Sequence, residues 1–301
     1  MSLCAATVSK LMDRSKKFIG SVCGILAAVC YGTNPFGALN LYAEGMATNS
    51  VLFYRFGMAW VIIAAVMAIR RENVRVSRKE FLTLTILGVL FTFSSLSLYE
   101  SFNLMAAGVA STILFTYPVM TAVIMATVFK ERITWQTVAA LLLSLAGVAT
   151  LYWSDGGGTL PVWGVVLVLV SALTYALYIV VVDRSDLRMS SFKINFYVVF
   201  YCALGMLVYT LVSGQTLVLP PSGRAWFFVG WLAVVPAIMA LSLMVYSAKY
   251  IGSTATAIIG ALEPLTAVAI GILVFGEPFG LRLVFGIALI LAAVVLTVLK
   301  K

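Results

Sequence analysis

The sequence has no histidine and few charged residues, because its 20 Lys and Arg and 11 Asp and Glu make up only 10% of the 301 residues. The missing histidine excludes His-based metal sites, His proton relays and catalysis by Ser-His or Cys-His pairs. Soluble domains contain about 25% charged and about 45–50% apolar residues. This chain is 62% hydrophobic and has a mean hydropathy of +1.08. Lipid must therefore surround most of the chain.

Motifs for metals and cofactors are missing as well. The four cysteines form no CxxC pair, so neither a disulfide framework nor a zinc site is indicated. No G-x-x-x-x-G-K-[ST] motif occurs, and Gly156-Gly-Gly158 is not followed by lysine, so an ATP-driven pump is not indicated. The net charge of +9 is not arranged as a basic run with interleaved aromatic residues. We expect no cofactor, no metal, no catalytic residue and no nucleic-acid partner.

Apolar segments that can cross a bilayer, at about 20 residues each, fill most of the chain. They predict an all-α integral membrane protein with ten transmembrane helices, short loops and no separate soluble domain. The predicted spans cover residues 19–43, 50–69, 80–103, 108–128, 134–153, 162–183, 193–213, 225–248, 255–275 and 280–299.

The Lys and Arg residues alternate between the two sides of these spans. Seventeen of the 20 fall in segments on one side, Arg224 and Arg282 fall on the other, and Arg55 lies within a span. Because cytoplasmic loops carry the excess of positive charge, the first side is cytoplasmic. We therefore expect a multi-pass protein of the cell's inner (plasma) membrane with both termini cytoplasmic, residues 1–18 forming the amino-terminal tail.

An internal repeat divides the chain. Residues 115–131 recur as residues 261–277. The matching positions include Pro118 with Pro264, Phe129 with Phe275 and Glu131 with Glu277. We therefore predict two five-helix repeats, at residues 19–155 and 156–301. Five is odd, so the second half enters the membrane from the opposite side, and such inverted-topology repeats are typical of secondary transporters.

Ten spans in two repeats, each with a Pro-containing helix and a Val-Phe-x-Glu turn at residues 128–131 and 274–277, resemble the EamA-type transporters of the drug/metabolite transporter superfamily, in their ten-span branch. The resemblance covers nearly the whole chain. It implies no enzyme but an exporter that moves small metabolites out of the cytoplasm, such as amino acids, aromatic ones among them, or drug-like cations such as paraquat. Its partners would be a small-molecule substrate and the lipid bilayer.

Two other functions stay open. An integral membrane enzyme acting on lipid or isoprenoid substrates would be expected to show His or clustered acids near one interface, and neither is visible. A passive channel is compatible with an inverted repeat. Saturable transport with counterflow would distinguish a carrier from a channel.

The candidate substrate-binding residues are a deep acid, prolines within spans and aromatic side chains. Glu263 lies about midway along the ninth span, and such buried ionisable residues are costly and often functional. It can couple transport to protons or hold a substrate amine; a structural hydrogen bond to a neighbouring helix is the alternative. Prolines within spans free a backbone carbonyl, which favours a cavity lining over a lipid-facing position. The predicted site contains Tyr31, Pro35, Tyr99, Tyr117, Pro118, Trp163, Tyr175, Tyr178, Glu263 and Pro264.

Four other charged residues receive a structural interpretation. Arg55 and Glu100 lie nearer the outer ends of their spans, so we expect them to reach the interface or to pair there. Glu131 and Glu277 lie at helix ends, where we expect capping or loop pairing.

Overall fold

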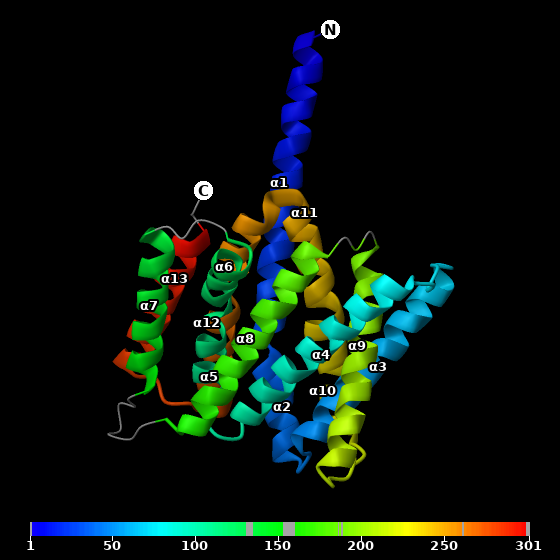
Figure 1. Cartoon of the computed structure of the whole chain (residues 1–301), viewed down its shortest axis with the longest axis vertical. Helices are drawn as coiled ribbons and strands as arrows, with labels where there is room; N and C mark the ends of the chain where they lie inside the picture. Colours follow the sequence, from blue (N-terminus) through cyan, green and yellow to red (C-terminus); the bar gives the residue numbers. More distant parts are fainter. Residues whose placement is uncertain are drawn as a thin grey trace.

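The computed structural model describes residues 2–130, 135–152, 160–185, 187, 189–260 and 262–298, which form a bundle of helices (Figure 1). Helix α1 begins and α13 ends at the same end of this bundle. The helices are α1 (Ser2–Gly32), α2 (Asn34–Ala43), α3 (Thr48–Ile69), α4 (Arg78–Ser101), α5 (Ala107–Leu114), α6 (Tyr117–Val128), α7 (Trp135–Tyr152), α8 (Val162–Arg184), α9 (Ser191–Val212), α10 (Gly223–Leu232), the π-helix η1 (Ala233–Met239), α11 (Ala240–Gly260), α12 (Leu262–Phe275) and α13 (Leu281–Val298).

Helices long and apolar enough to cross a membrane number seven within the described residues. They cover Lys17–Ala43, Thr48–Ile69, Arg78–Ser101, Ala107–Val128, Val162–Val182, Phe192–Val212 and Gly223–Met244. Shorter apolar helices occupy Val138–Leu151, Leu262–Phe275 and Leu281–Ala293, within the other three predicted spans. The prediction of an all-α membrane fold is confirmed, whereas the number ten stays a prediction.

The boundary between the eighth and ninth predicted spans is wrong. A loop was expected over residues 249–254, but α11 is helical from Ala240 to Gly260. Each residue of a helix interior satisfies its backbone polar groups within the helix. Continuing the helix therefore avoids exposing unpaired N–H and C=O groups near lipid, where each would cost several kcal/mol.

Two of the predicted spans are broken into two helices beside a proline. α1 stops at Gly32 and α2 begins at Asn34, with Pro35 in its first turn. α5 stops at Leu114 and α6 begins at Tyr117, with Pro118 in its first turn. Proline has no N–H to donate and clashes with the preceding turn, so it is tolerated at a helix start but not in its interior.

Two other features mark the second half of the chain. Pro264 follows Glu263 in the first turn of α12. Pro236 lies inside η1, where the wider π-helical turn interrupts an otherwise continuous helix between α10 and α11. The prolines that lie within the predicted spans therefore mark helix starts and a π-helical segment.

Serine caps define several helix starts outside the apolar segments. At α4, the Ser77 hydroxyl accepts the N–H of Glu80, and the Glu80 carboxylate accepts the N–H of Ser77, which completes a capping box. Ser190 and Ser222 cap α9 and α10 in the same way, each accepting the N–H three residues later.

Helix packing places different pairs at the centre and at the edge of the bundle. α7 packs mainly on α13, and these two helices lie together at one edge (Figure 1). Their contact uses small residues: a Cβ added to Gly147 would lie 2.6 Å from Ile290, and one added to Gly286 would lie 2.5 Å from Leu151. Close helix approach of this kind stabilises helix pairs in lipid. The other large contacts are α1 with α11, α4 with α8, α3 with α9, α4 with α9 and α5 with α12.

Candidate functional site

Three of the predicted tyrosines gather where α6 meets α8. Tyr117, in the first turn of α6, packs edge-on against Tyr175 of α8, with ring centroids 4.7 Å apart. Tyr175 and Tyr178 are stacked at 6.0 Å with 7° between their planes. Phe91 of α4 contacts both of these rings, at 6.2 and 5.3 Å. The result is an aromatic cluster built from α4, α6 and α8.

Glu263 adjoins this cluster from the second half of the chain. Its carboxylate lies within electrostatic range of the phenols of Tyr31, Tyr117 and Tyr175. Its backbone closely approaches α1, because a Cβ added to Gly32 would lie 2.7 Å from the Glu263 carbonyl oxygen. We call Tyr31, Tyr117, Tyr175, Tyr178 and Glu263 the central cluster.

A hydrogen-bonded chain lies beside the central cluster and includes Arg55. The Arg55 guanidinium (Nη1) donates to the Tyr99 hydroxyl at 2.5 Å, and that hydroxyl donates to Asn34 Oδ1 at 3.1 Å. Asn34 Nδ2 donates to the Tyr31 carbonyl oxygen at 2.8 Å. This chain joins α3, α4 and α2, at the break that follows α1.

The expected position of Arg55 at the outer interface is wrong. Its side chain is only 4% exposed, and it lies over the rings of Phe56 and Tyr99 at 5.1 and 5.3 Å. It does not pair with Glu100, whose carboxylate accepts from the Asn103 amide at 3.5 Å. The inward direction follows from Tyr99, which offers the guanidinium a buried acceptor and an aromatic face.

A small cavity lies next to these groups. It measures about 10 Å³ and is lined in part by Tyr31, Arg55, Phe91, Tyr178 and Asn195. That is room for about one water molecule, far below the 300–1,000 Å³ or so typical of ligand pockets. Binding a metabolite here requires the surrounding helices to separate.

The predicted prolines flank the central cluster. Pro35 and Pro264 are buried, whereas Pro118 is half-buried. Next to Pro118, the buried hydroxyl of Thr116 has no hydrogen-bond partner among the described residues. An unpaired hydroxyl costs free energy unless water or a ligand reaches it, which is compatible with a cavity lining at the break between α5 and α6.

Trp163 stands apart from the other predicted site residues. It lies in the first turn of α8, and 69% of its side chain is exposed. Tryptophan is enriched at membrane interfaces, where its ring contacts both lipid and headgroups. We therefore do not include Trp163 in the proposed site.

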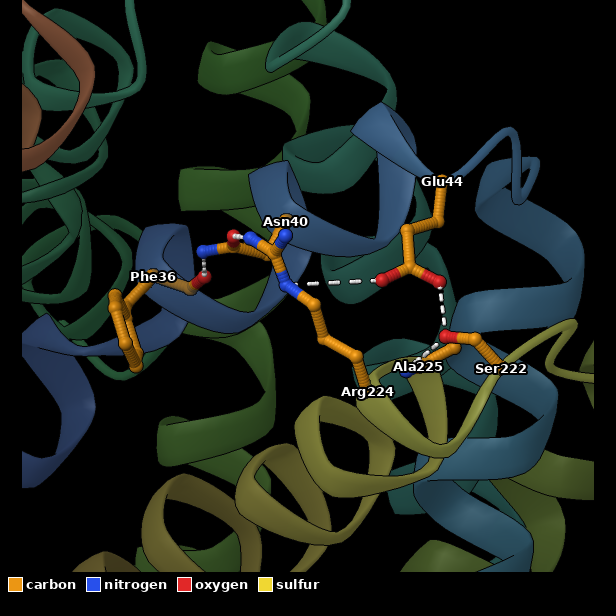
Figure 2. A network of polar contacts seen from close by, with 6 residues as sticks. All are labelled: Phe36, Asn40, Glu44, Ser222, Arg224 and Ala225. Carbon is orange, nitrogen blue, oxygen red and sulfur yellow. Dashed lines mark hydrogen bonds and ion pairs between the residues drawn. The ribbon is translucent and has the colours of Figure 1, made fainter.

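The two halves of the chain are also joined where α2 ends and α10 begins (Figure 2), on the side that the predicted topology makes the outer one. The Arg224 guanidinium donates to Asn40 Oδ1 at 2.7 Å and forms an ion pair with Glu44 at 3.7 Å. The Ser222 hydroxyl donates to the other Glu44 carboxylate oxygen while accepting the N–H of Ala225. We call Asn40, Glu44, Ser222 and Arg224 the outer network.

Glu277 caps a helix of the opposite half, which confirms its predicted structural role. Its carboxylate oxygens accept the N–H groups of Ala107 and Gly108, at 2.6 and 3.0 Å, at the start of α5. A Cβ added to Gly108 or Gly271 would lie within 3 Å of this carboxylate, so glycine at both positions makes room for it. Burial raises the pKa of Glu277, and the hydrogen bonds from Gly108 and Ala107 oppose that shift. Its repeat counterpart Glu131 lies outside the described residues.

A larger groove has a different character. About 570 Å³ in volume, it lies between α3, α9 and α10 and is lined by residues such as Met58, Trp60, Leu204 and Trp226. Among the residues that the structure describes, no charged side chain contributes to this lining. An apolar groove without convergent polar groups suits lipid chains better than a polar metabolite. The candidate site is therefore the central cluster with its neighbour Arg55.

Comparison with known families decides what kind of protein carries this site. A model of the EamA-like transporter family matches residues 18–153 and, a second time, residues 162–299. The chain belongs to the EamA-like transporter family. It is therefore a multi-pass membrane transporter rather than an enzyme. The two matches are separated by residues 154–161, and the division into two five-helix repeats stays a prediction.

Relatives in three microorganisms support this assignment. An uncharacterized transporter of Archaeoglobus fulgidus is 27% identical over 279 residues, covering 92% of this chain and 95% of the relative. One from Clostridium kluyveri is 23% identical and covers 89% of each chain. YdfC of Bacillus subtilis, also named an uncharacterized transporter, is 22% identical and covers 88% and 86%.

A solved crystal structure shares the fold. It superposes with a TM-score of 0.65 at 17% sequence identity and covers 92% of this chain and 95% of that structure. At this identity the likeness shows the fold alone.

Two residues next to the site, Arg55 and Asn34, were absent from the predicted set. Arg55 was noticed in the sequence but assigned to the interface, because its place near the outer end of the span suggested snorkelling. Asn34 bonds Tyr31 and Tyr99. A polar residue directly before a proline within a span is the signal that could have indicated it.

Proposed function

We propose that the protein is a secondary active transporter that exports small metabolites, amino acids or drug-like cations, by alternating access around the central cluster. The observation that carries this proposal is the position of Glu263 among three tyrosines from both halves of the chain, beside broken helices. Discontinuous helices near mid-membrane expose backbone and side-chain groups that bind substrates in transporters. We place the protein in the inner membrane with both termini cytoplasmic.

The pairwise packing of the helices supports ten spans in two inverted repeats. When each helix is replaced by its counterpart in the other repeat, the contact of α1 with α11 corresponds to that of α8 with α4. In the same way, the contact of α6 with α8 corresponds to that of α12 with α1. The pairs α3–α9, α5–α12 and α7–α13 map onto themselves. Two halves that exchange equivalent contacts in this way can open a central site to one side and then to the other.

Contacts between the two halves close the side of the bundle that we propose is the outer one. The outer network joins α2 to α10, and Glu277 joins α12 to α5. Both connections link the first half to the second. In the proposed cycle, these links separate when the central cluster opens outward and form again when it opens to the cytoplasm.

Glu263 selects or couples the substrate in this proposal. A carboxylate among phenols and apolar helices is stable when protonated or when paired with a cation. Proton binding from outside and amine binding from the cytoplasm would then compete for the same oxygens. Such competition couples export of the substrate to entry of a proton.

The test is transport by Glu263→Gln in proteoliposomes, with and without a proton gradient. The amide keeps size and hydrogen bonding but cannot bind the proton or pair with an ammonium group. We expect the gradient to stop accelerating transport, while wild type and the control Glu100→Gln still respond. If Glu263→Gln folds and transports at the wild-type rate and with the wild-type pH profile, Glu263 has only a structural role.

A passive channel is the second candidate, since an inverted repeat is compatible with it. A channel needs a continuous path, whereas the central cavity holds about one water molecule. The closed centre favours a carrier.

A further inference from the structure

Arg55 presents an unusual buried charge. It lies two turns into α3, with 4% of its side chain exposed. Its guanidinium donates to the Tyr99 hydroxyl, while its Nε has no hydrogen-bond partner among the described residues. Within the same part of the chain, no carboxylate lies within ion-pair distance of it.

Such a charge is costly unless an anion compensates it. Arginine has five N–H donors and does not lose its proton in proteins. A cation removed from water without a counter-ion destabilises the fold. The phenol of Tyr99 accepts one of the five hydrogen bonds, and the faces of Phe56 and Tyr99 contribute cation–π attraction. The remaining donors have the geometry that suits a carboxylate.

The guanidinium also faces the space where a ligand would bind. Arg55 lines the central cavity together with Tyr31, Phe91 and Tyr178. Tyr31 lies within electrostatic range of both Arg55 and Glu263. One permanent cation therefore lines the central cavity, and one acid, Glu263, lies within electrostatic range of Tyr31 in the same lining.

We infer that Arg55 binds the carboxylate of the transported substrate, which makes the substrate a zwitterion such as an α-amino acid rather than a simple drug-like cation. The inference rests on the proposed function and narrows its substrate class. A zwitterion places its carboxylate at Arg55 and its ammonium group at Glu263, so each buried charge gains a partner. A phosphate would meet Glu263 with charge of the same sign, and a simple amine would leave Arg55 uncompensated.

The experiment compares matched compounds in counterflow with proteoliposomes. Each of the 20 or so standard amino acids is tested beside the amine that lacks its carboxylate, for example phenylalanine beside phenethylamine. The proteins are wild type, Arg55→Gln, Arg55→Lys and the control Arg70→Gln, which removes an exposed arginine from the end of the same helix. Elution as a single species from size exclusion verifies folding.

We expect Arg55→Gln to lower the apparent affinity for the carboxylate compounds by about 10- to 100-fold, the range for hydrogen bonds to charged groups, and to leave the amines unaffected. Arg55→Lys keeps the charge but not the planar fork, so it should show a smaller loss with the same selectivity. If Arg55→Gln does not fold, the selectivity of Arg55→Lys alone tests whether Arg55 binds the carboxylate. Equal effects on both classes overturn the inference, as does a wild type that moves only amines; the proposed function survives both results. A wild type that moves neither class contradicts both.

Discussion

Gly32 is the position where the fold and the proposed site depend most directly on each other. It ends α1, next to Tyr31, and faces the first turn of α12. A Cβ added there would lie 2.5 Å from Thr266 Cβ, 2.7 Å from the Glu263 carbonyl oxygen and 2.9 Å from Thr266 Cγ2. Carbon atoms pack best at about 3.5–4.0 Å. Gly32→Ala must therefore push α1 and α12 apart by roughly 1 Å, since the backbone carbonyl cannot rotate away.

The expected cost of Gly32→Ala is about 1–3 kcal/mol, the range for overpacked interiors. For a chain of this size, each kcal/mol lowers the melting temperature by about 1–2 °C. The separation also moves Tyr31 away from Glu263, so the apparent KM for the transported substrate should rise. Thermal unfolding in nanodiscs and transport in proteoliposomes measure the two effects.

The matched control is Gly57→Ala in α3, where an added Cβ has no neighbour within 4 Å. It should be neutral or stabilising by about 0.5–1 kcal/mol, because alanine loses less backbone entropy than glycine within a helix. If Gly32→Ala unfolds and transports like wild type, then α1 and α12 do not approach as described and the central cluster is not assembled at their contact.

Four other predictions concern the ends of the bundle. Glu277→Ala should lower the unfolding free energy by at least about 1–3 kcal/mol, because it leaves backbone N–H groups without acceptors; a loss no larger than that of Glu277→Gln would contradict the cap. Because the pKa of Glu277 is raised above its usual 4.5, its neutral form fits the fold better. Wild-type stability should thus fall, relative to Glu277→Gln, as pH rises above that value; a constant difference between pH 4 and 8 or so would refute this. Arg224→Gln should cost less than about 1 kcal/mol, since its side chain is 66% exposed; thermal unfolding that shows a loss above roughly 3 kcal/mol would mean the outer network is buried when closed. A thiol reagent added outside intact cells should label a cysteine at position 156 but not one at the carboxyl terminus, and labelling of both would refute the topology.

The helices of this fold could be predicted from hydropathy, but not all of their boundaries could. In lipid, the backbone N–H and C=O groups of an apolar run of about 20 residues must form hydrogen bonds within the run. This requirement is why the helical class and most helix boundaries could be predicted. The residues around 249–254 interrupt the apolar run, yet they lie within α11. Hydropathy reports where a chain meets lipid, and it does not distinguish a loop from a helix that extends past the bilayer.

The site was predicted in part. Tyr117, Tyr175, Tyr178 and Glu263 were chosen for their depth in the spans, and the structure brings them together. Arg55 was misplaced because a position near a span end says nothing about which way the side chain points. Only the Tyr99 phenol, 44 residues away in sequence, reveals its inward direction.

Counterflow through the purified protein tests the central claim most directly. Liposomes loaded with an unlabelled amino acid or amine are placed in a trace of the same labelled compound, and its uptake is followed. A carrier with one central site should show saturable uptake that unlabelled substrate on the opposite side accelerates. Uptake that rises linearly with concentration, or that does not respond to substrate on the opposite side, would contradict alternating access around the central cluster.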